Sequence, residues 1–309
     1  MKKLDLIIRV GLSILILFIL FKKIGFSNVV SNISSVNLSI LILILFIFLI
    51  SLIIGAVNLK ILLSPLSKNI SFYKIFYYSV LSWAVGLFVP GKIGEFSFVP
   101  LLKKEGVRVG HGSAIFILDK LITLVVLSIF SLIGIYLFFD IATFIRLTII
   151  TSIIIIAFIF FIFLKVGRNF IKKYFLRGFS EKFRGFFKLI SIYIKKEKSL
   201  LLLNIIFTFF KWFITSLISY FLFMGYGQDI SIVYIFLLNS VLVMVSLIPV
   251  SLSGLGVRES MAVFLYSKLS VEPSITFSVF LIQLIIMYPL ATIMVLWGLK
   301  EIKFKLTSY

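Results

Sequence analysis

Long apolar stretches, rather than a regular alternation of apolar and polar positions, dominate this chain. About 20 helical residues cross a bilayer core of roughly 30 Å, and five uncharged runs approach or exceed that length: 38–59, 121–139, 147–164, 230–257 and 273–299. Three further apolar stretches contain Arg9, Lys74 and Lys211: 4–21, 71–89 and 200–227, respectively. The pattern predicts an all-α, polytopic membrane bundle of about eight hydrophobic segments, forming a single transmembrane domain over residues 1–309.

The composition supports a lipid environment and excludes several kinds of chemistry. With 61% hydrophobic and only 14% charged residues, the chain cannot cover itself with a water-facing surface. No cysteine is present, so disulfides, thiolate metal sites and a cysteine nucleophile are excluded. His111 is the single histidine, and we expect it in an interfacial loop because it has no partner ligands. We therefore expect neither a metal site nor a cofactor. The first apolar segment lacks a small-residue cleavage site, and we expect it to remain as a helix.

Basic residues are concentrated in the segment 165–198, which holds eleven of the 31 Lys and Arg residues and only two glutamates. Phenylalanines recur there near helical spacing, so one interpretation is an interfacial amphipathic helix pair whose lysines meet anionic inner-leaflet lipid. The other is a basic cytoplasmic loop that only sets topology. Because the basic residues are clustered beside apolar helices, we expect them to face a membrane surface and expect no nucleic-acid partner.

The charge distribution also bears on topology. If all eight segments crossed the membrane, the segment 165–198 and the N-terminal lysines would lie on opposite sides, against the positive-inside rule. Two re-entrant hairpins, at 71–112 and 230–267, remove this conflict. We then expect a multi-pass protein of the cell membrane whose N-terminus, 165–198 segment and C-terminus face the cytoplasm.

The two predicted hairpins resemble each other in sequence. FVPGKIGE at 88–95 and LIPVSLSGLGVRE at 247–259 both contain two apolar residues, a proline, a glycine-rich turn, a basic residue and a glutamate. Proline and glycine break helices, and paired breaks in two halves of a transporter indicate inverted repeats with a substrate site between them. The alternative is two ordinary helix-ending turns whose likeness is accidental.

Few ionisable residues fall within the predicted membrane segments. Because each costs roughly 2.5–3.5 kcal/mol to insert, all seven are candidates for substrate binding: Lys92, Glu95, Asp119, Lys120, Lys211, Arg258 and Glu259. Four cations against three carboxylates favour a phosphate-bearing headgroup, which Arg258 can bind bidentately. Backbone N–H groups of the glycine turns add donors for an anion, from Gly91, Gly94, Gly254 and Gly256.

Each of these residues also has a structural interpretation. Asp119 and Lys120 would mark the start of a helix at the interface, and Lys211, beside the common interface residue Trp212, would snorkel outward. Arg258 and Glu259 would pair with residues of the other motif. Four amides are expected to join helices rather than bind substrate: Asn58, Asn204, Asn239 and Gln283.

Enzymatic signatures are absent from the sequence. It has no Gly-x-Ser-x-Gly element, no P-loop and no second histidine. We therefore expect that the chain is not an enzyme and has no catalytic residues.

Three segments resemble the transmembrane domain of the lysylphosphatidylglycerol synthase/flippase family: PGKIGE at 90–95, AIFILDKL at 114–121 and IPVSLSGLGVRE at 248–259. The resemblance extends over nearly the whole chain, and its most specific part is the Gly-x-Gly-x-Arg-Glu element. In that family the domain moves aminoacylated phospholipid between leaflets, often beside a soluble synthase domain, which this sequence lacks. Asp119-Lys120 stands where the family pattern has a Glu-Arg pair, and lysine lacks the bidentate fork of arginine.

The resemblance implies a flippase-like transporter that moves an anionic or zwitterionic phospholipid, or a lipid-linked sugar, between leaflets. The alternative is a membrane-embedded accessory subunit that binds polyprenyl phosphate for a glycosylation or lipid-modifying enzyme. Membrane lipids are the expected partners, together with a second copy of the chain or a glycosyltransferase or synthase.

Overall fold

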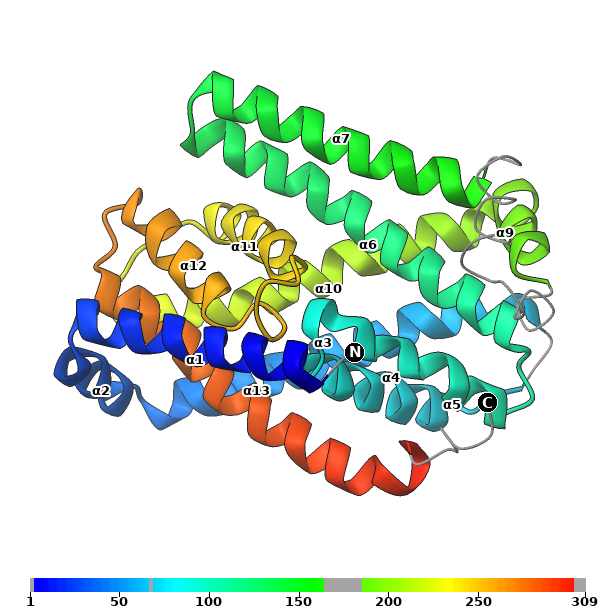
Figure 1. The fold of residues 1–309 in the computed structure, drawn as a ribbon, viewed down its shortest axis with the longest axis horizontal. Coiled ribbons are helices and arrows are strands. Elements are labelled where there is room, and N and C mark those ends of the chain that lie inside the picture. The colour runs from blue at the N-terminus through cyan, green and yellow to red at the C-terminus, as the bar shows by residue number, and fades with distance from the viewer. Residues whose placement is uncertain (1–2, 67–68, 164–184, 303–309) are drawn as a thin grey trace.

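The computed structural model describes residues 3–66, 69–163 and 185–302, and within these ranges the chain is helical and contains no strand. Figure 1 shows the helices lying roughly along one direction of an elongated bundle. Two short 3-10 helices, η1 and η2, interrupt the α-helices. In chain order the elements are α1 Lys3–Ile24, α2 Phe26–Ser35, α3 Leu38–Leu63, η1 Ser64–Leu66, α4 Phe72–Leu87, η2 Pro90–Ser97, α5 Phe98–Lys104, α6 Val109–Phe138, α7 Ile141–Phe163, α9 Phe186–Lys195, α10 Lys198–Gly225, α11 Ile232–Ser246, α12 Val257–Ser267 and α13 Pro273–Ile302.

Four helices among the described residues are long and apolar enough to cross a membrane: Leu38–Leu66, Val109–Phe138, Lys198–Gly225 and Pro273–Gly298. Shorter apolar helices, Ile141–Ile154 and Ile232–Ser246, accompany them. Large apolar side chains point outward, for example Ile42 and Phe46 on α3, as expected of helices that meet lipid. The predicted all-helical membrane class is therefore confirmed, whereas the count of eight segments remains a prediction.

The uncharged run 230–257 is interrupted where its glycine-rich motif predicts a helix break, because α11 ends at Ser246 and an irregular loop follows. One predicted boundary was wrong. The helix predicted to begin near Asp119 begins at Val109 instead, so Asp119 and Lys120 lie well inside α6, and His111 lies in its first turn rather than in a loop. Charges inside an apolar helix resemble an end of that helix in sequence, but here they face polar partners inside the bundle.

The centre of the bundle is built by helices that are distant in sequence. α3 packs along α10, α11 packs along α6, and α4 contacts α3, α13 and η2. Side-chain oxygens of Asn37, Ser71 and Ser231 accept backbone N–H bonds at the starts of α3, α4 and α11, which satisfies donors that a helix start leaves free. These contacts hold α4–η2–α5 and α11–α12 as two hairpins on either side of the bundle centre (Figure 1).

Most of the basic segment 165–198 lies outside the described residues, but α9 belongs to it. Phe186, Ile190 and Tyr193 of α9 are buried in the same apolar cluster as Leu62 of α3, and the Tyr193 hydroxyl donates a hydrogen bond to the Leu62 carbonyl. An interfacial amphipathic helix pair, one of the two interpretations of the segment 165–198, would instead place the apolar side chains of α9 in the headgroup layer. Their apolar face is covered by protein because α9 packs against α6 and α10.

Candidate functional site

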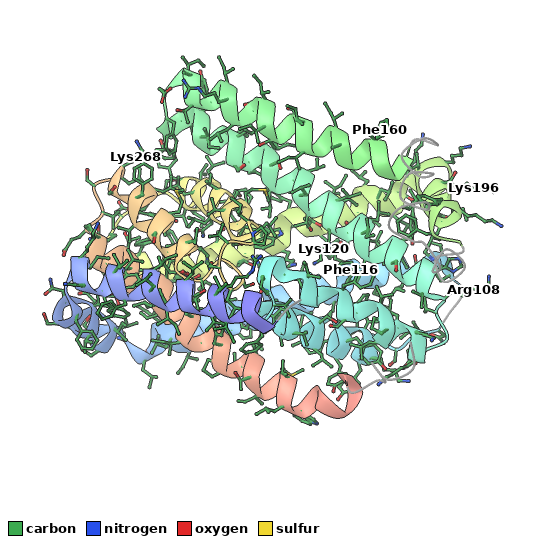
Figure 2. The ribbon with its side chains drawn as sticks, viewed as in Figure 1. Arg108, Phe116, Lys120, Phe160, Lys196 and Lys268 are labelled. Carbon is green, nitrogen blue, oxygen red and sulfur yellow. The ribbon has the colours of Figure 1, made fainter. Side chains whose placement is uncertain are left out.

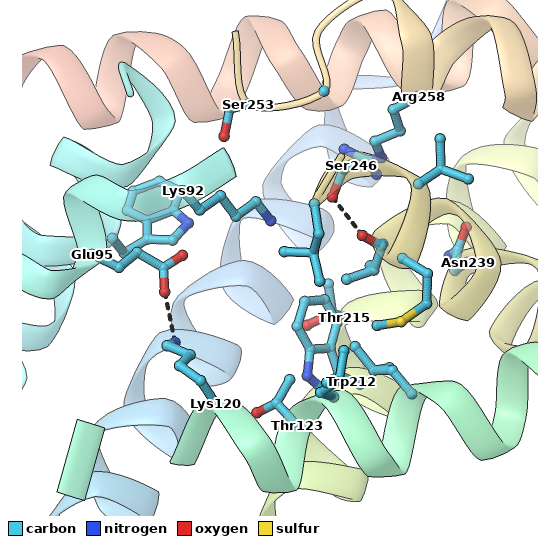
Figure 3. Close-up of a pocket in the computed structure, with 18 of the residues that line it drawn as sticks. Lys92, Glu95, Lys120, Thr123, Trp212, Thr215, Asn239, Ser246, Ser253 and Arg258 are labelled. Atoms are coloured by element: carbon cyan, nitrogen blue, oxygen red, sulfur yellow. Dashed lines mark hydrogen bonds and ion pairs between the residues drawn. The ribbon is translucent and has the colours of Figure 1, made fainter. Parts of the chain in front are cut away.

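A cavity of about 1140 Å³ occupies the centre of the bundle, where both hairpins end. Its walls come from α3, α4, η2, α6, α7, α10, α11, α12 and α13. Figure 3 shows Lys92 and Arg258 entering this space from opposite sides, with Lys120 and Trp212 on a third. The cavity therefore brings together charged residues from the two sequence motifs and from two long helices.

The first loop begins where α4 ends and passes through η2. Gly91 and Lys92 both have positive φ, 61° and 56°, a conformation that is uncommon for lysine and indicates local strain at a site fixed by its surroundings. Gly94 packs so closely on α4 that a Cβ atom there would lie 2.6 Å from the Val85 carbonyl oxygen. The missing side chain at Gly94 therefore lets the loop fold back on α4.

The second loop, between α11 and α12, has the same kind of construction. Positive φ occurs at Ser253 (51°), Gly254 (85°) and Gly256 (83°). A Cβ atom at Gly254 would lie 2.7 Å from the Cα atom of Ser246, at the end of α11. Each loop thus contains a proline and places one glycine directly against the helix that precedes it.

The two loops also meet each other. A Cβ atom built on Gly91 would lie 3.4 Å from the Cβ atom of Pro249, which is ordinary van der Waals contact. The Ser253 hydroxyl donates a hydrogen bond of 3.3 Å to the Gly86 carbonyl of α4. The sequence motifs that resemble each other are therefore neighbours in space.

Two of the three carboxylates have partners from other helices. Glu95 Oε2 lies 2.6 Å from Lys120 Nζ, an ion pair that joins η2 to α6. Asp119 accepts a hydrogen bond of 3.3 Å from the Asn58 amide, and its other oxygen lies 3.6 Å from Lys120 Nζ. The single Lys120 ammonium is therefore shared between Glu95 and Asp119.

Glu259 is different, because its partner belongs to its own helix. It is 1% exposed, and its Oε2 accepts a 2.7 Å hydrogen bond from the backbone N–H of Gly256, just before α12. Its Oε1 has no hydrogen-bond partner in the described part of the chain. The expected ion pair between Glu259 and the other motif does not form there.

Three cations line the cavity without a carboxylate partner within 4.0 Å among the described residues: Lys92, Lys211 and Arg258. Lys211 lies near the middle of α10 with its Nζ 5.1 Å from the centre of the Trp212 ring, so it faces the cavity rather than a membrane surface. The Arg258 guanidinium lies over Phe280, 5.0 Å from the ring centre, and donates a 3.0 Å hydrogen bond to Gln283. Its Nε atom has no hydrogen-bond partner among the described residues. With Lys120 these groups make four cations against the three carboxylates that line the cavity, a formal excess of one positive charge.

The predicted amides do join helices. The Asn58 side-chain amide donates a hydrogen bond to the Thr208 hydroxyl, and the Asn58 backbone carbonyl accepts one from the Asn204 side-chain amide. A second chain of hydrogen bonds runs from Tyr266 through Asn239 and Ser219 to Gln283 and then to Arg258. The role of these amides as links between helices is confirmed, although Asn58, Asn239 and Gln283 also line the cavity.

Nine of the eleven predicted site residues line the cavity: Gly91, Lys92, Glu95, Asp119, Lys120, Lys211, Gly254, Arg258 and Glu259. Gly94 and Gly256 lie outside the lining and shape the loops instead. The sequence predicted an interfacial position for Trp212, but Trp212 lines the cavity, and its indole N–H has no hydrogen-bond partner among the described residues. The sequence feature that could have indicated this position is the neighbouring Lys211, a charged residue in the middle of an apolar helix. Trp212 also lies four residues, about one helical turn, before Ser216, which lines the cavity.

Comparison with known proteins agrees with this architecture. An uncharacterised relative, a UPF0104 membrane protein of Methanothermobacter thermautotrophicus, is 26% identical over 184 residues, 52% of this chain and 54% of the relative. The chain thus aligns with about half the length of this relative. The family described as the lysylphosphatidylglycerol synthase TM region matches residues 6–294. The chain therefore belongs to the family of the lysylphosphatidylglycerol synthase transmembrane region.

Proposed function

We propose that this protein is a flippase-like transporter that passes an anionic or zwitterionic lipid headgroup between leaflets through its central cavity. The observation that carries the proposal is the imbalance of charge in that cavity. Lys92, Lys211 and Arg258 face it without carboxylate partners among the described residues, whereas Glu95 and Asp119 are engaged by Lys120 and Asn58. A phosphate group is the lipid component that such a set of donors would bind.

The size of the cavity also suits this function. At about 1140 Å³ it exceeds the roughly 300–1,000 Å³ of sites for drug-sized ligands. Irregular backbone within a membrane is tolerated where it is buried in protein or lines a wet cavity, and the two strained loops border this one. We therefore interpret α4–η2–α5 and α11–α12 as two re-entrant hairpins of an inverted repeat.

The proposed orientation follows from the basic residues. In Figure 2 Arg108 and Lys196 lie at one end of the bundle and Lys268 lies at the other. Under the positive-inside rule, we propose that the end with Arg108 and Lys196 faces the cytoplasm, together with both termini. Single cysteines in this cysteine-free chain provide the test, because Lys196→Cys should resist impermeant maleimide in intact cells and Lys268→Cys should react.

Transport can be tested with purified protein in vesicles that carry fluorescent phosphatidylglycerol. Arg258→Ala should reduce transfer to the rate of protein-free vesicles, and Arg258→Lys should retain part of it, because a compact ammonium replaces one phosphate contact but not a bidentate one. Lys103→Met is the matched control, since Lys103 is exposed on α5 outside the cavity. Full transfer by a folded Arg258→Ala protein would show that Arg258 is not needed for transport and that its role is structural, through its hydrogen bond to Gln283.

The alternative function, a subunit that binds polyprenyl phosphate without moving it, draws on the same cationic cavity. It predicts that polyprenyl phosphate copurifies in mild detergent and that the reconstituted protein transfers no lipid. Mass spectrometry of the copurified lipid, combined with the transfer assay, separates the two functions.

A further inference from the structure

The central cavity has an apolar extension that the charged residues do not explain. Beyond Lys120, the side of α6 that lines the cavity continues through Leu124, Leu127 and Ile135 to Phe139, just after the end of α6. Ser128 and Ser131 also line this stretch, and their hydroxyls bond to Met244 Sδ and to the Ser128 carbonyl. From α7 it is lined by Leu147, Thr151 and Ile154, and from α12 by Met261 and Phe264. We call this part of the cavity the α7 wing.

We propose that the α7 wing is a lateral slot that holds the acyl chains of the lipid whose headgroup lies among Lys92, Lys211 and Arg258. This inference rests on the proposed transport function and adds to it the place where the tails leave the protein. A headgroup can enter a protein cavity within a bilayer only if its attached chains keep an apolar path to the lipid.

The wing is open to the side of the bundle. Ile154 of α7 and Phe264 of α12 both line the cavity, yet they are 47% and 50% exposed. Residues that are half exposed and also line a central cavity mark its opening. Because both are large and apolar, the opening favours a hydrocarbon chain over water or a polar solute.

The wing also has sufficient length. From Leu124 to Phe139 the rise of 1.5 Å per residue gives about 22 Å, whereas one leaflet contributes about 15 Å of hydrocarbon, half of the roughly 30 Å core. The lining of the wing therefore runs farther along α6 than the acyl chains of one leaflet extend.

The far end of the slot and its α7 side are held by different contacts. At the far end, Lys268 Nζ lies 4.7 Å from the centre of the Phe139 ring and 5.4 Å from that of Phe264, which ties the end of α6 to α12 through cation–π contacts. Along its length α7 packs chiefly on α6, and Figure 1 shows it at the outer edge of the bundle. The side formed by α7 can therefore separate from α12 without disturbing the ion pair of Glu95 and Lys120.

Cysteine modification tests the slot directly, since the native chain has no cysteine. Thr151→Cys lines the wing, and Ile153→Cys, two residues away on α7, is 60% exposed and outside the cavity lining. Each purified variant is labelled with a bulky hydrophobic methanethiosulfonate. Transfer of fluorescent phosphatidylglycerol is then measured in vesicles, and binding of glycerophosphoglycerol, the same headgroup without acyl chains, is measured by calorimetry in detergent.

Labelled Thr151→Cys should lose transfer to the rate of protein-free vesicles and keep its glycerophosphoglycerol affinity, while labelled Ile153→Cys should keep both. Leu147→Cys provides a second position in the wing if labelled Thr151→Cys does not melt cooperatively. Equal transfer by the labelled wing variants and labelled Ile153→Cys, with headgroup binding intact, would overturn the slot but not the transport function. Failure of the unmodified protein both to bind the headgroup and to transfer lipid would overturn the transport function and the slot with it.

Discussion

The two glycine-rich loops are alike in sequence and in backbone, but they satisfy their glutamates in different ways. Glu95 of the first loop forms an ion pair with Lys120 of a distant helix. Glu259 of the second loop caps the start of α12 by accepting from the Gly256 N–H, and its other oxygen has no hydrogen-bond partner among the described residues. The same residue type in the same sequence context therefore joins two elements in one loop and caps the start of a helix in the other.

The hairpins that carry these loops differ in the same way at their bases. Lys74 and Tyr78 at the start of α4 both bind Glu105 after α5, so charge holds the first hairpin at its tip and at its base. The second hairpin is held by neutral groups, from Tyr266 through Asn239 to Ser219. Charge pairs therefore hold the first hairpin at both ends, whereas neutral hydrogen bonds from Tyr266 and a bond from Arg258 to the neutral Gln283 hold the second.

Removal of each glutamate charge in turn should give the largest difference between the two loops. Glu95→Gln leaves Lys120 without its closest partner, and breaking a buried pair costs about 3–5 kcal/mol. We expect about 2–3 kcal/mol, because the Lys120 side chain is 41% exposed to the cavity and retains Asp119. Glu259→Gln should cost less than about 1 kcal/mol, because the amide oxygen can still accept from Gly256. Denaturant unfolding in detergent measures both.

A double variant is the control for this prediction. Lys120→Met in the Glu95→Gln background removes the unpaired ammonium and should recover part of the lost stability. If Glu95→Gln and Glu259→Gln cost the same, the difference between the loops is only geometric.

The next prediction concerns the backbone that the loops share. Gly94→Ala places a methyl group 2.6 Å from the Val85 carbonyl oxygen, and Gly254→Ala places one 2.7 Å from the Ser246 Cα atom. Overpacking of this kind costs about 1–3 kcal/mol, and Gly254→Ala should cost more because its φ of 85° also strains any side chain. Thermal melts of both variants are compared with Gly11→Ala, whose added Cβ meets nothing within 4 Å. Unchanged melting of Gly94→Ala would contradict the close approach of the first loop to α4.

The neutral chain in the second hairpin gives a smaller effect. Tyr266→Phe removes the hydroxyl that donates to Asn239 at 3.2 Å, and we expect a loss of about 1 kcal/mol. Because no charge is involved, the loss should be the same at low and high salt. A strong salt dependence would show that the positive charge of Arg258, at the other end of the chain of bonds, affects the strength of the Tyr266 hydrogen bond.

Much of this arrangement was predictable from sequence because membranes impose strong rules. An apolar run of about 20 residues has few alternatives to a helix, and charges within such runs are rare enough to indicate a site. All seven charged residues that were chosen line one cavity for this reason. The paired glycine motifs predicted two helix breaks, and the structure has a break at each.

The partners of these residues were not predictable, because they depend on packing between helices distant in sequence. Nothing near Glu95 in sequence indicates that Lys120 is its partner. Glu259 has the same sequence context as Glu95, which does not indicate that its carboxylate accepts a hydrogen bond from the Gly256 N–H. The start of α6 was misplaced because Asp119 and Lys120 resemble an interface. Lys120 instead pairs with Glu95 of η2, and Asp119 accepts a hydrogen bond from Asn58 of α3.

The smallest predicted effect belongs to the base of the first hairpin, outside the membrane-spanning helices. The hydrogen bond from Lys74 lowers the pKa of Glu105 below its ordinary value, burial opposes this, and the Tyr78 hydroxyl adds to the lowering. Since the folded pKa is below the unfolded one, the ionised carboxylate stabilises the fold above about pH 4.3, the value for an unperturbed glutamate. This contribution is lost as the pH falls through the lowered pKa.

Glu105→Gln should therefore cost less than about 1 kcal/mol at neutral pH, because Lys74 is half exposed and its attraction is screened. The difference in stability between the variant and the native protein should shrink as the pH falls below the pKa of an unperturbed glutamate and the native carboxylate becomes protonated. Melting curves of both proteins over this pH range measure the difference. A gap that persists unchanged at the lowest pH would show that Glu105 acts through its neutral hydrogen bond with Tyr78, and charge would then hold the first hairpin only at its Glu95 end.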